Sequence, residues 1–236
     1  VVYKQGALVK ENFTTGDDGS ATLKGLYLGT YRVTEMKAPT NLICAGESKE
    51  VTLSYAGQNV EVAVGDLTFV NDRQKAKVFA EKQDKDTKKP LAGAVFGLYA
   101  GKDIKNQDGQ VVVVKDTLIA KATTDEMGSG AFAADLPNNN SYYVKELQAP
   151  ANYFRNSDEV YSFDFLYTND KEATVSFSHT FSNEHVSASI HLVKKDKETG
   201  NVTQGDAKFA GAVYGVYARE NIAHPDGKSG VLYKKD

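Results

Sequence analysis

The stretch "YYVKELQAPANY", residues 142–153, contains a short strand pattern that leads into an Ala-Pro turn. Side chains along a strand alternate between two faces, so Tyr142, Val144 and Glu146 are expected to share one face. Glu146 therefore ends an apolar stripe that would face the core. Because an unpaired charge is very unfavourable in a core, this carboxylate requires buried partners.

The same stretch reveals an internal repeat of about a hundred residues, which is a common domain size. Glu35 precedes Glu146 by 111 residues, and Asn71 precedes Asn183 by 112 residues. The recurring segments are "YRVTEMKAPTN" (31–41) with "YYVKELQAPAN" (142–152), "FVN" (69–71) with "FSN" (181–183), and "AEKQDKDTKKPLAGAVFGLYA" (80–100) with "LVKKDKETG…KFAGAVYGVYA" (192–218).

These spacings divide the chain into three parts. Residues 1–74 hold the C-terminal part of one repeat, residues 75–185 a complete repeat, and residues 186–236 the N-terminal part of a third. Short alternating or β-branched runs are separated by turn clusters, and no long segment has helical periodicity. The sequence therefore predicts an all-β chain of tandem β-sandwich or barrel-like domains, one complete and two partial.

The composition excludes several classes of partner and chemistry. A net charge of −3 gives no reason to expect nucleic-acid binding, and no apolar run is long enough to cross a membrane. The single cysteine, Cys44, excludes an internal disulfide framework and is predicted to be a solitary thiol. We expect neither a metal site nor a cofactor, since the histidines lack metal-type spacing. They are His179, His185, His191 and His224.

A lysine and an asparagine occupy positions like that of Glu146. In the strand pattern that opens the complete repeat, Lys82 follows Val78 and Ala80 on one face. In the pattern that closes it, Asn183 follows Phe181 on an apolar face. Three polar groups at the inner ends of apolar stripes are best explained if they meet.

Such a set of groups is chemically reactive in a dry pocket. Burial lowers the pKa of a lysine and raises that of a carboxylic acid, so both can be neutral. A neutral amine is a nucleophile, and a protonated Glu146 could polarise the side-chain carbonyl of Asn183. Attack by Lys82 and loss of ammonia would leave an amide bond in a single-turnover reaction. A non-covalent polar cluster that fixes the strand register is the alternative.

These motifs resemble those of the Cna B-type domains, also called SpaA-like or prealbumin-like domains, of Gram-positive surface adhesins and pilins. The resemblance covers the whole chain and implies tandem immunoglobulin-like or prealbumin-like sandwiches. It implies that Lys82 and Asn183 form an intramolecular isopeptide bond with the assistance of Glu146. The equivalent residues in the partial repeats would be Glu35, Asn71 and Lys194.

The resemblance also implies a biological role. The segment would belong to a structural stalk or shaft of an extracellular, cell-wall-attached adhesin or pilin, with neighbouring repeats of the same chain as partners. The anchor and signal peptide would lie outside this segment. An adhesive module that binds a host glycan or matrix protein is the alternative function. No constellation typical of an enzyme stands out, so we expect no catalysis beyond the self-reaction.

Two positions depart from the family pattern in their turns. The family usually has glycine after the Ala-Pro, where this chain has Asn41 and Asn152. The turn glycine after the Asp-x-x-Thr stretch is Lys88 in the complete repeat but Gly200 in the third. Asparagine tolerates the left-handed backbone that glycine supplies, so the Ala-Pro turn is expected to survive.

Overall fold

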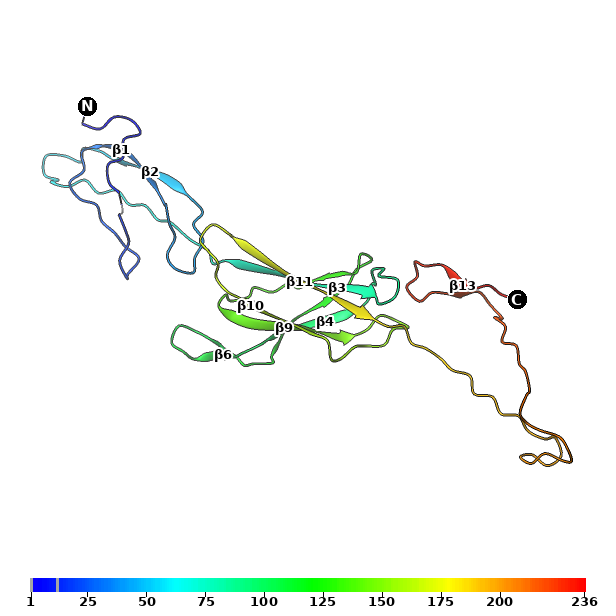
Figure 1. The fold of residues 1–236 in the computed structure, drawn as a ribbon. Coiled ribbons are helices and arrows are strands. Elements are labelled where there is room, and N and C mark those ends of the chain that lie inside the picture. Colours follow the sequence, from blue (N-terminus) through cyan, green and yellow to red (C-terminus); the bar gives the residue numbers. More distant parts are fainter. Residues whose placement is uncertain (1, 12) are drawn as a thin grey trace. The chain divides into compact units, whose positions relative to one another are not determined.

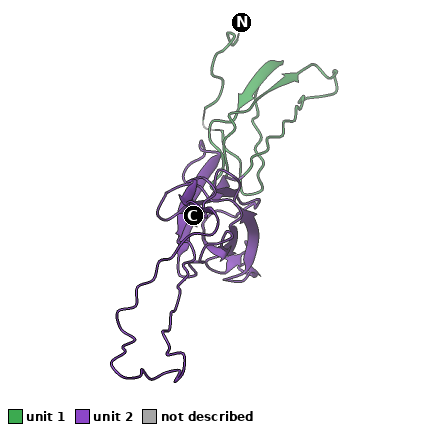
Figure 2. Ribbon diagram, turned by 90° about the vertical axis from the view of Figure 1, so that its right-hand side faces the viewer, with its two compact units in different colours: residues 1–72 green, residues 73–236 purple. Residues whose placement is uncertain are grey.

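The computed structural model describes residues 2–11 and 13–236, and that part of the chain contains strands and no helices (Figure 1). Residues 1 and 12, which fall in the predicted partial repeat 1–74, lie outside the described residues. Two compact units are present, residues 1–72 and residues 73–236 (Figure 2). The all-β prediction is thus confirmed. Among the described residues, no helix has the length and apolar character needed to cross a membrane.

The second unit contains a sandwich of two sheets, which occupies residues 75–183. The first sheet has the strand order β11-β3-β8, formed by β3 (Lys75–Asp84), β8 (Ser129–Ala131) and β11 (Thr174–Asn183). The second has the order β10-β9-β4-β7, formed by β4 (Val95–Ala100), β7 (Leu118–Thr123), β9 (Asn140–Gln148) and β10 (Val160–Phe165). A small hairpin follows β4, formed by β5 (Ile104–Lys105) and β6 (Val111–Val113).

Alternating burial shows why these residues form a sandwich. Along β9, Tyr142, Val144 and Glu146 are buried while the residues between them are half-buried. The inner faces of both sheets supply the aromatic core, in which Phe96 and Phe181 lie 4.7 Å apart between ring centroids. Burial of such side chains provides most of the folding free energy of a small domain.

The first and last strands of the sandwich lie side by side and run parallel. β3 pairs with β11 over ten residue pairs, from Lys75↔Thr174 to Asp84↔Asn183. A parallel pair requires a long crossover connection, and here the rest of the sandwich supplies it. Because the two strands end at the same edge, their last inward-facing side chains meet there.

The remaining strands are short. In the first unit, β1 (Gly29–Thr34) pairs with β2 (Ser48–Leu53). Near the end of the chain, β12 (Ile222–Ala223) pairs with β13 (Val231–Tyr233). Residues 186–217 contain no named strand and expose Ile190, among other apolar side chains. The division into one complete and two partial repeats stays a prediction.

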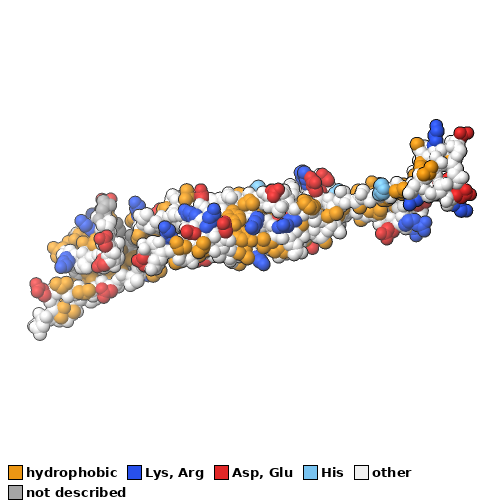
Figure 3. Space-filling model, turned by 90° about the horizontal axis from the view of Figure 1, so that it is seen from below, with side chains coloured by type: hydrophobic (Ala, Val, Ile, Leu, Met, Phe, Trp, Pro, Cys, Tyr) orange, Lys and Arg blue, Asp and Glu red, His pale blue; other side chains and the backbone are white. Residues whose placement is uncertain are grey.

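The turn residues adopt the expected left-handed backbone. Asn41 and Asn152 have φ angles of 68° and 69°, so asparagine replaces glycine after each Ala-Pro. Lys88 has a φ of 58° where Gly200 has 82°, which shows that the two turns share one conformation. On the face drawn in Figure 3, basic and acidic side chains are interspersed, in keeping with 28 Lys and Arg against 31 Asp and Glu.

Gly128 is the glycine that the site most depends on. It has a φ of +74°, and a Cβ atom there would lie 2.4 Å from the backbone oxygen of Lys82. We expect Gly128→Ala to lower the free energy of unfolding by about 2–3 kcal/mol, because the strained φ and the clash with rigid backbone add together. Chemical denaturation of the full chain measures this change.

Gly109→Ala is the matched control. Gly109 has a similar φ of +79°, but nothing lies within 4 Å of the added Cβ. Only the backbone term remains, so a loss of about 1–2 kcal/mol is expected. Equal losses for the two variants would contradict the role assigned to the close approach between Gly128 and β3.

Candidate functional site

Three buried polar side chains meet inside the sandwich, and we refer to them as the triad. They are Lys82 on β3, Glu146 on β9 and Asn183 on β11, with relative exposures of 2%, 2% and 1%. β3 and β11 belong to one sheet and β9 to the other, so the triad joins the two layers (Figure 1). In each strand, the polar residue continues the inward-facing apolar stripe, which is why the fold places it in the core.

The triad forms a closed triangle of polar contacts. The Nζ atom of Lys82 lies 3.0 Å from Oε1 of Glu146 and donates to Oδ1 of Asn183 at 2.5 Å. The Nδ2 atom of Asn183 donates to both carboxylate oxygens of Glu146, at 3.0 and 3.1 Å. Buried charges are tolerated when such partners surround them, so the triangle accounts for the three polar residues in the core.

Apolar side chains line the triad. The ring centroid of Phe96 lies 5.7 Å from the Nζ atom of Lys82, and Phe181 packs against that ring. Burial lowers the pKa of Lys82 below its ordinary value, although the neighbouring Glu146 opposes the shift. The uncharged, nucleophilic amine is therefore easier to reach here than in water.

The orientation of the asparagine differs from our expectation. We expected the Glu146 carboxyl group to contact the carbonyl oxygen of Asn183, but it contacts the amide nitrogen, and Lys82 takes the oxygen. Glu146 thus lies about one hydrogen bond from both the attacking nitrogen and the departing nitrogen. This position suits a proton shuttle between them better than polarisation of the carbonyl.

The first unit repeats two-thirds of the arrangement. Asn71 Nδ2 donates to Glu35 Oε2 at 2.7 Å and to the backbone oxygen of Ile43 at 3.0 Å. Within the described residues, no lysine contacts this pair. The side chain of Lys194 is exposed, and its Nζ reaches only the neighbouring Lys195 backbone at 3.5 Å. The structure therefore assembles the complete set once, at the triad.

The solitary thiol lies close to the partial site of the first unit. Cys44 is buried, and its Sγ atom donates weakly to the backbone oxygen of Glu35 at 3.5 Å. This contact orders the turn that carries Glu35.

A second polar cluster, which the sequence did not predict, lies at the end of β3. Asp84, His224 and Asp226 are all buried and place their ligand-type atoms within 4.8 Å of one another. Our search for metal-type spacing missed them because Asp84 is far from the other two in sequence. The Asp-x-x-Thr turn at Asp84 and the His-Pro-Asp-Gly loop were the available signals.

A family model and several solved structures match the chain. The model of the SpaA prealbumin-like fold domain matches residues 1–68 and again residues 76–180. Among solved structures, the TIE protein of Bacillus anthracis is 28% identical with a TM-score of 0.48, covering 73% of this chain and 28% of that one. No curated protein matches.

Two pilin structures are also similar. The pilus 2b backbone protein of group B streptococcus is 20% identical with a TM-score of 0.36, covering 64% of this chain and 52% of that one. The shaft pilin spaA of Lactobacillus rhamnosus GG is 17% identical with a TM-score of 0.33, covering 68% of this chain and 66% of that one. The chain therefore spans about a quarter to two-thirds of the length of these structures.

Proposed function

Because the chain belongs to the family of SpaA prealbumin-like fold domains, we propose that it is a stalk segment of a cell-surface pilin or adhesin, and that residues 75–185 lock themselves with an isopeptide bond. The triad is the observation that carries this proposal. A carboxylate alone would suffice to neutralise a buried lysine. The additional carboxamide, held 2.5 Å from the amine, supplies the electrophile for an amide bond.

The reaction begins with a proton transfer inside the ion pair. Glu146 accepts a proton from the ammonium group of Lys82 across 3.0 Å, which leaves a neutral amine and a carboxylic acid. The amine then attacks Cγ of Asn183 and forms a tetrahedral intermediate. The low polarity of the pocket favours the neutral pair, because desolvation already lowers the pKa of Lys82.

The second half of the reaction releases ammonia. Glu146 gives its proton to the Nδ2 atom, which it already contacts at 3.0 and 3.1 Å, and takes another proton from the attacking nitrogen. The bond between Cγ and Nδ2 breaks, ammonia leaves, and an amide joins Lys82 to Asn183. Every proton is accounted for: of the two lost by Lys82, one leaves with the ammonia and one remains on Glu146.

The proposed role places the segment outside the cell, in a protein attached to the wall. Its partners would be neighbouring repeats of the same chain. The two matches of the family model, at residues 1–68 and 76–180, support a tandem arrangement. A chain with one cysteine has no disulfide to hold it folded outside the cell, and the internal amide would replace one.

The mass of the intact purified chain tests the cross-link. We expect the wild type to be lighter than its sequence by one molecule of ammonia, with a peptide that joins Lys82 to Asn183 after proteolysis. Only one ammonia is expected, because the Glu35–Asn71 pair lacks a lysine among the described residues.

Lys82→Met is the control for this measurement. Methionine fills a similar volume without a nucleophile, so this variant is expected to have its full sequence mass. A full mass for the folded wild type would contradict the covalent proposal and leave a non-covalent cluster that fixes the strand register.

A further inference from the structure

We propose that the loop 224–230, between β12 and β13, is a docking element that fastens the strand pair β12–β13 to the end of the sandwich formed by residues 75–183. Its receptor is the turn after β3, which begins at Asp84. The inference rests on the proposed function only in treating residues 186–236 as the start of the next stalk repeat. It then deepens that function, because such a contact fixes one repeat against another.

The first contact is made by Asp226. Its Oδ2 atom accepts a hydrogen bond from the hydroxyl group of Thr87 at 3.0 Å. Its Oδ1 atom accepts from the backbone nitrogens of Lys228 and Ser229, at 2.8 and 2.7 Å. One carboxylate therefore shapes the loop and binds the receptor turn at the same time.

The second contact is made by His224. Its Nδ1 atom lies 3.2 Å from Oδ2 of Asp226 and 4.0 Å from Oδ2 of Asp84. The same oxygen of Asp84 accepts a hydrogen bond from the hydroxyl group of Tyr153 at 2.7 Å. The imidazole ring is thereby inserted between a carboxylate of the loop and a carboxylate of the receptor.

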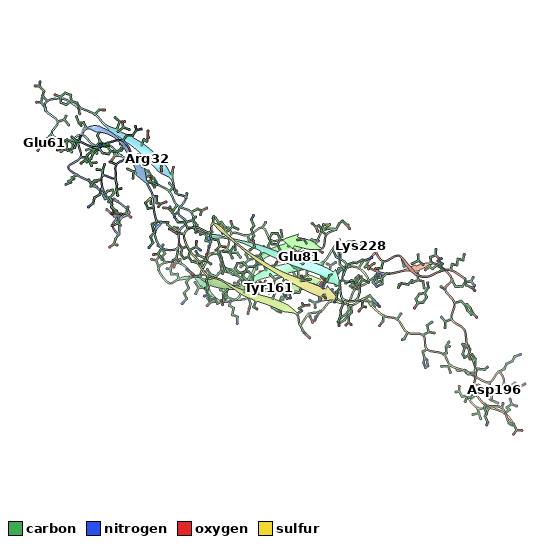
Figure 4. The ribbon with its side chains drawn as sticks, turned by 45° about the horizontal axis from the view of Figure 1, so that its top comes forward. Arg32, Glu61, Glu81, Tyr161, Asp196 and Lys228 are labelled. Carbon is green, nitrogen blue, oxygen red and sulfur yellow. The ribbon has the colours of Figure 1, made fainter. Side chains whose placement is uncertain are left out.

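Two lysines complete the contact in opposite directions. Lys89, in the receptor turn, donates to the backbone oxygen of Lys228 at 2.9 Å. Lys228, in the loop, donates to the backbone oxygens of Pro90 and Glu126, each at 2.8 Å. In Figure 4, Lys228 lies near the end of β3, the strand that carries Glu81. Each side therefore contributes a cation to carbonyl groups of the other.

A comparison with the hairpin β5–β6 shows that docking causes the burial. That hairpin has the similar loop "NQDGQ", in which Asn106 and Asp108 take the places of His224 and Asp226. Asn106 and Asp108 are exposed, whereas His224 and Asp226 are only 8% and 7% exposed. A loop of this kind does not bury its own polar side chains, so the receptor buries those of loop 224–230.

The charges of the cluster agree with direct docking. Burial raises the pKa of Asp226, but hydrogen bonds from Ser229, Lys228 and Thr87 outweigh it and hold the pKa below its ordinary value. The pKa of Asp84 is likewise lowered on balance, since hydrogen bonds from Thr87, Tyr153 and Asp86 outweigh its burial. Both carboxylates are ionised and fully hydrogen-bonded, so the protein groups themselves make the contact.

Hydrogen exchange in the full-length chain, followed by mass spectrometry, tests the docking. We expect Lys228→Ala to speed exchange at least about tenfold both in loop 224–229 and in the receptor segments 84–91 and 126–128. Thr87→Val, made on the receptor side, is expected to speed exchange in loop 224–229. Lys234→Ala, which alters an exposed lysine of the same segment, is the matched control and is expected to change neither.

Two results would overturn the proposal. One is exchange in the receptor segments that stays at the wild-type rate in Lys228→Ala. The other is release of the loop by EDTA, which would mean that a bridging cation holds the cluster together. The mass of Lys228→Ala keeps the two proposals apart, because the variant leaves the triad intact and should still lack one ammonia.

Discussion

Replacing Glu146 with glutamine is expected to slow formation of the Lys82–Asn183 bond by a factor of about 100 to 10,000, which is the usual contribution of a general acid–base group. Glutamine keeps the size of the side chain and can accept a hydrogen bond from Asn183. It cannot take the proton of Lys82 or return one to the departing nitrogen. The intact mass, followed over time after synthesis, measures the rate as the loss of one ammonia.

Two further variants make this prediction specific. Glu81→Gln changes a half-buried glutamate on the same strand as Lys82, whose side chain instead accepts from Ser129 at 2.9 Å, and it should react at the wild-type rate. Glu146→Asp keeps the acid but shortens its reach, so an intermediate rate is expected. A wild-type rate in Glu146→Gln would show that Glu146 only positions its neighbours.

Replacing Asn183 with alanine is expected to lower the free energy of unfolding of the middle sandwich by roughly 5 kcal/mol, with a fall in Tm of about 20 °C or more. The bond between Lys82 and Asn183 closes a loop of about a hundred residues. By analogy with a disulfide, closing such a loop removes about 4.7 kcal/mol of conformational entropy from the unfolded chain. Differential scanning calorimetry of the full chain measures the loss.

Asn71→Ala is the control for the stability measurement. Asn71 makes the same contact with Glu35, at 2.7 Å, that Asn183 makes with Glu146, but no lysine of the described residues completes the set. It should therefore leave the transition of the middle sandwich unchanged. A loss of only about 1–3 kcal/mol in Asn183→Ala would instead match one missing hydrogen-bonding partner and no covalent bond.

The sequence was sufficient to predict the architecture and the inward direction of the triad. Strand side chains alternate strictly, so a polar residue that follows two apolar ones by steps of two must share their face. The burial of Tyr142, Val144 and Glu146 follows from this rule. The unfavourable burial of isolated charges then predicted that residues about a hundred positions apart would meet.

Other features depend on interactions that alternation does not report. The amide plane of Asn183 is set by a side-chain torsion and by competition between two neighbours, so its orientation could not be read from strand pattern. The docking of His224 and Asp226 on Asp84 joins segments 140 residues apart through loops, where no periodicity exists. In sequence, "HPDGKSG" resembles an ordinary solvated turn.

The parallel pairing of β3 with β11 determines how a stretched filament would respond once the amide has formed. Lys82 and Asn183 lie near the C-terminal ends of both strands. Tension that enters at the start of β3 would run along its backbone, cross the amide and leave directly after β11. The roughly hundred residues between Lys82 and Asn183 would stay slack, so about 340 Å of potential extension would be withheld from each such repeat. A shaft of these repeats would behave as a nearly inextensible tether.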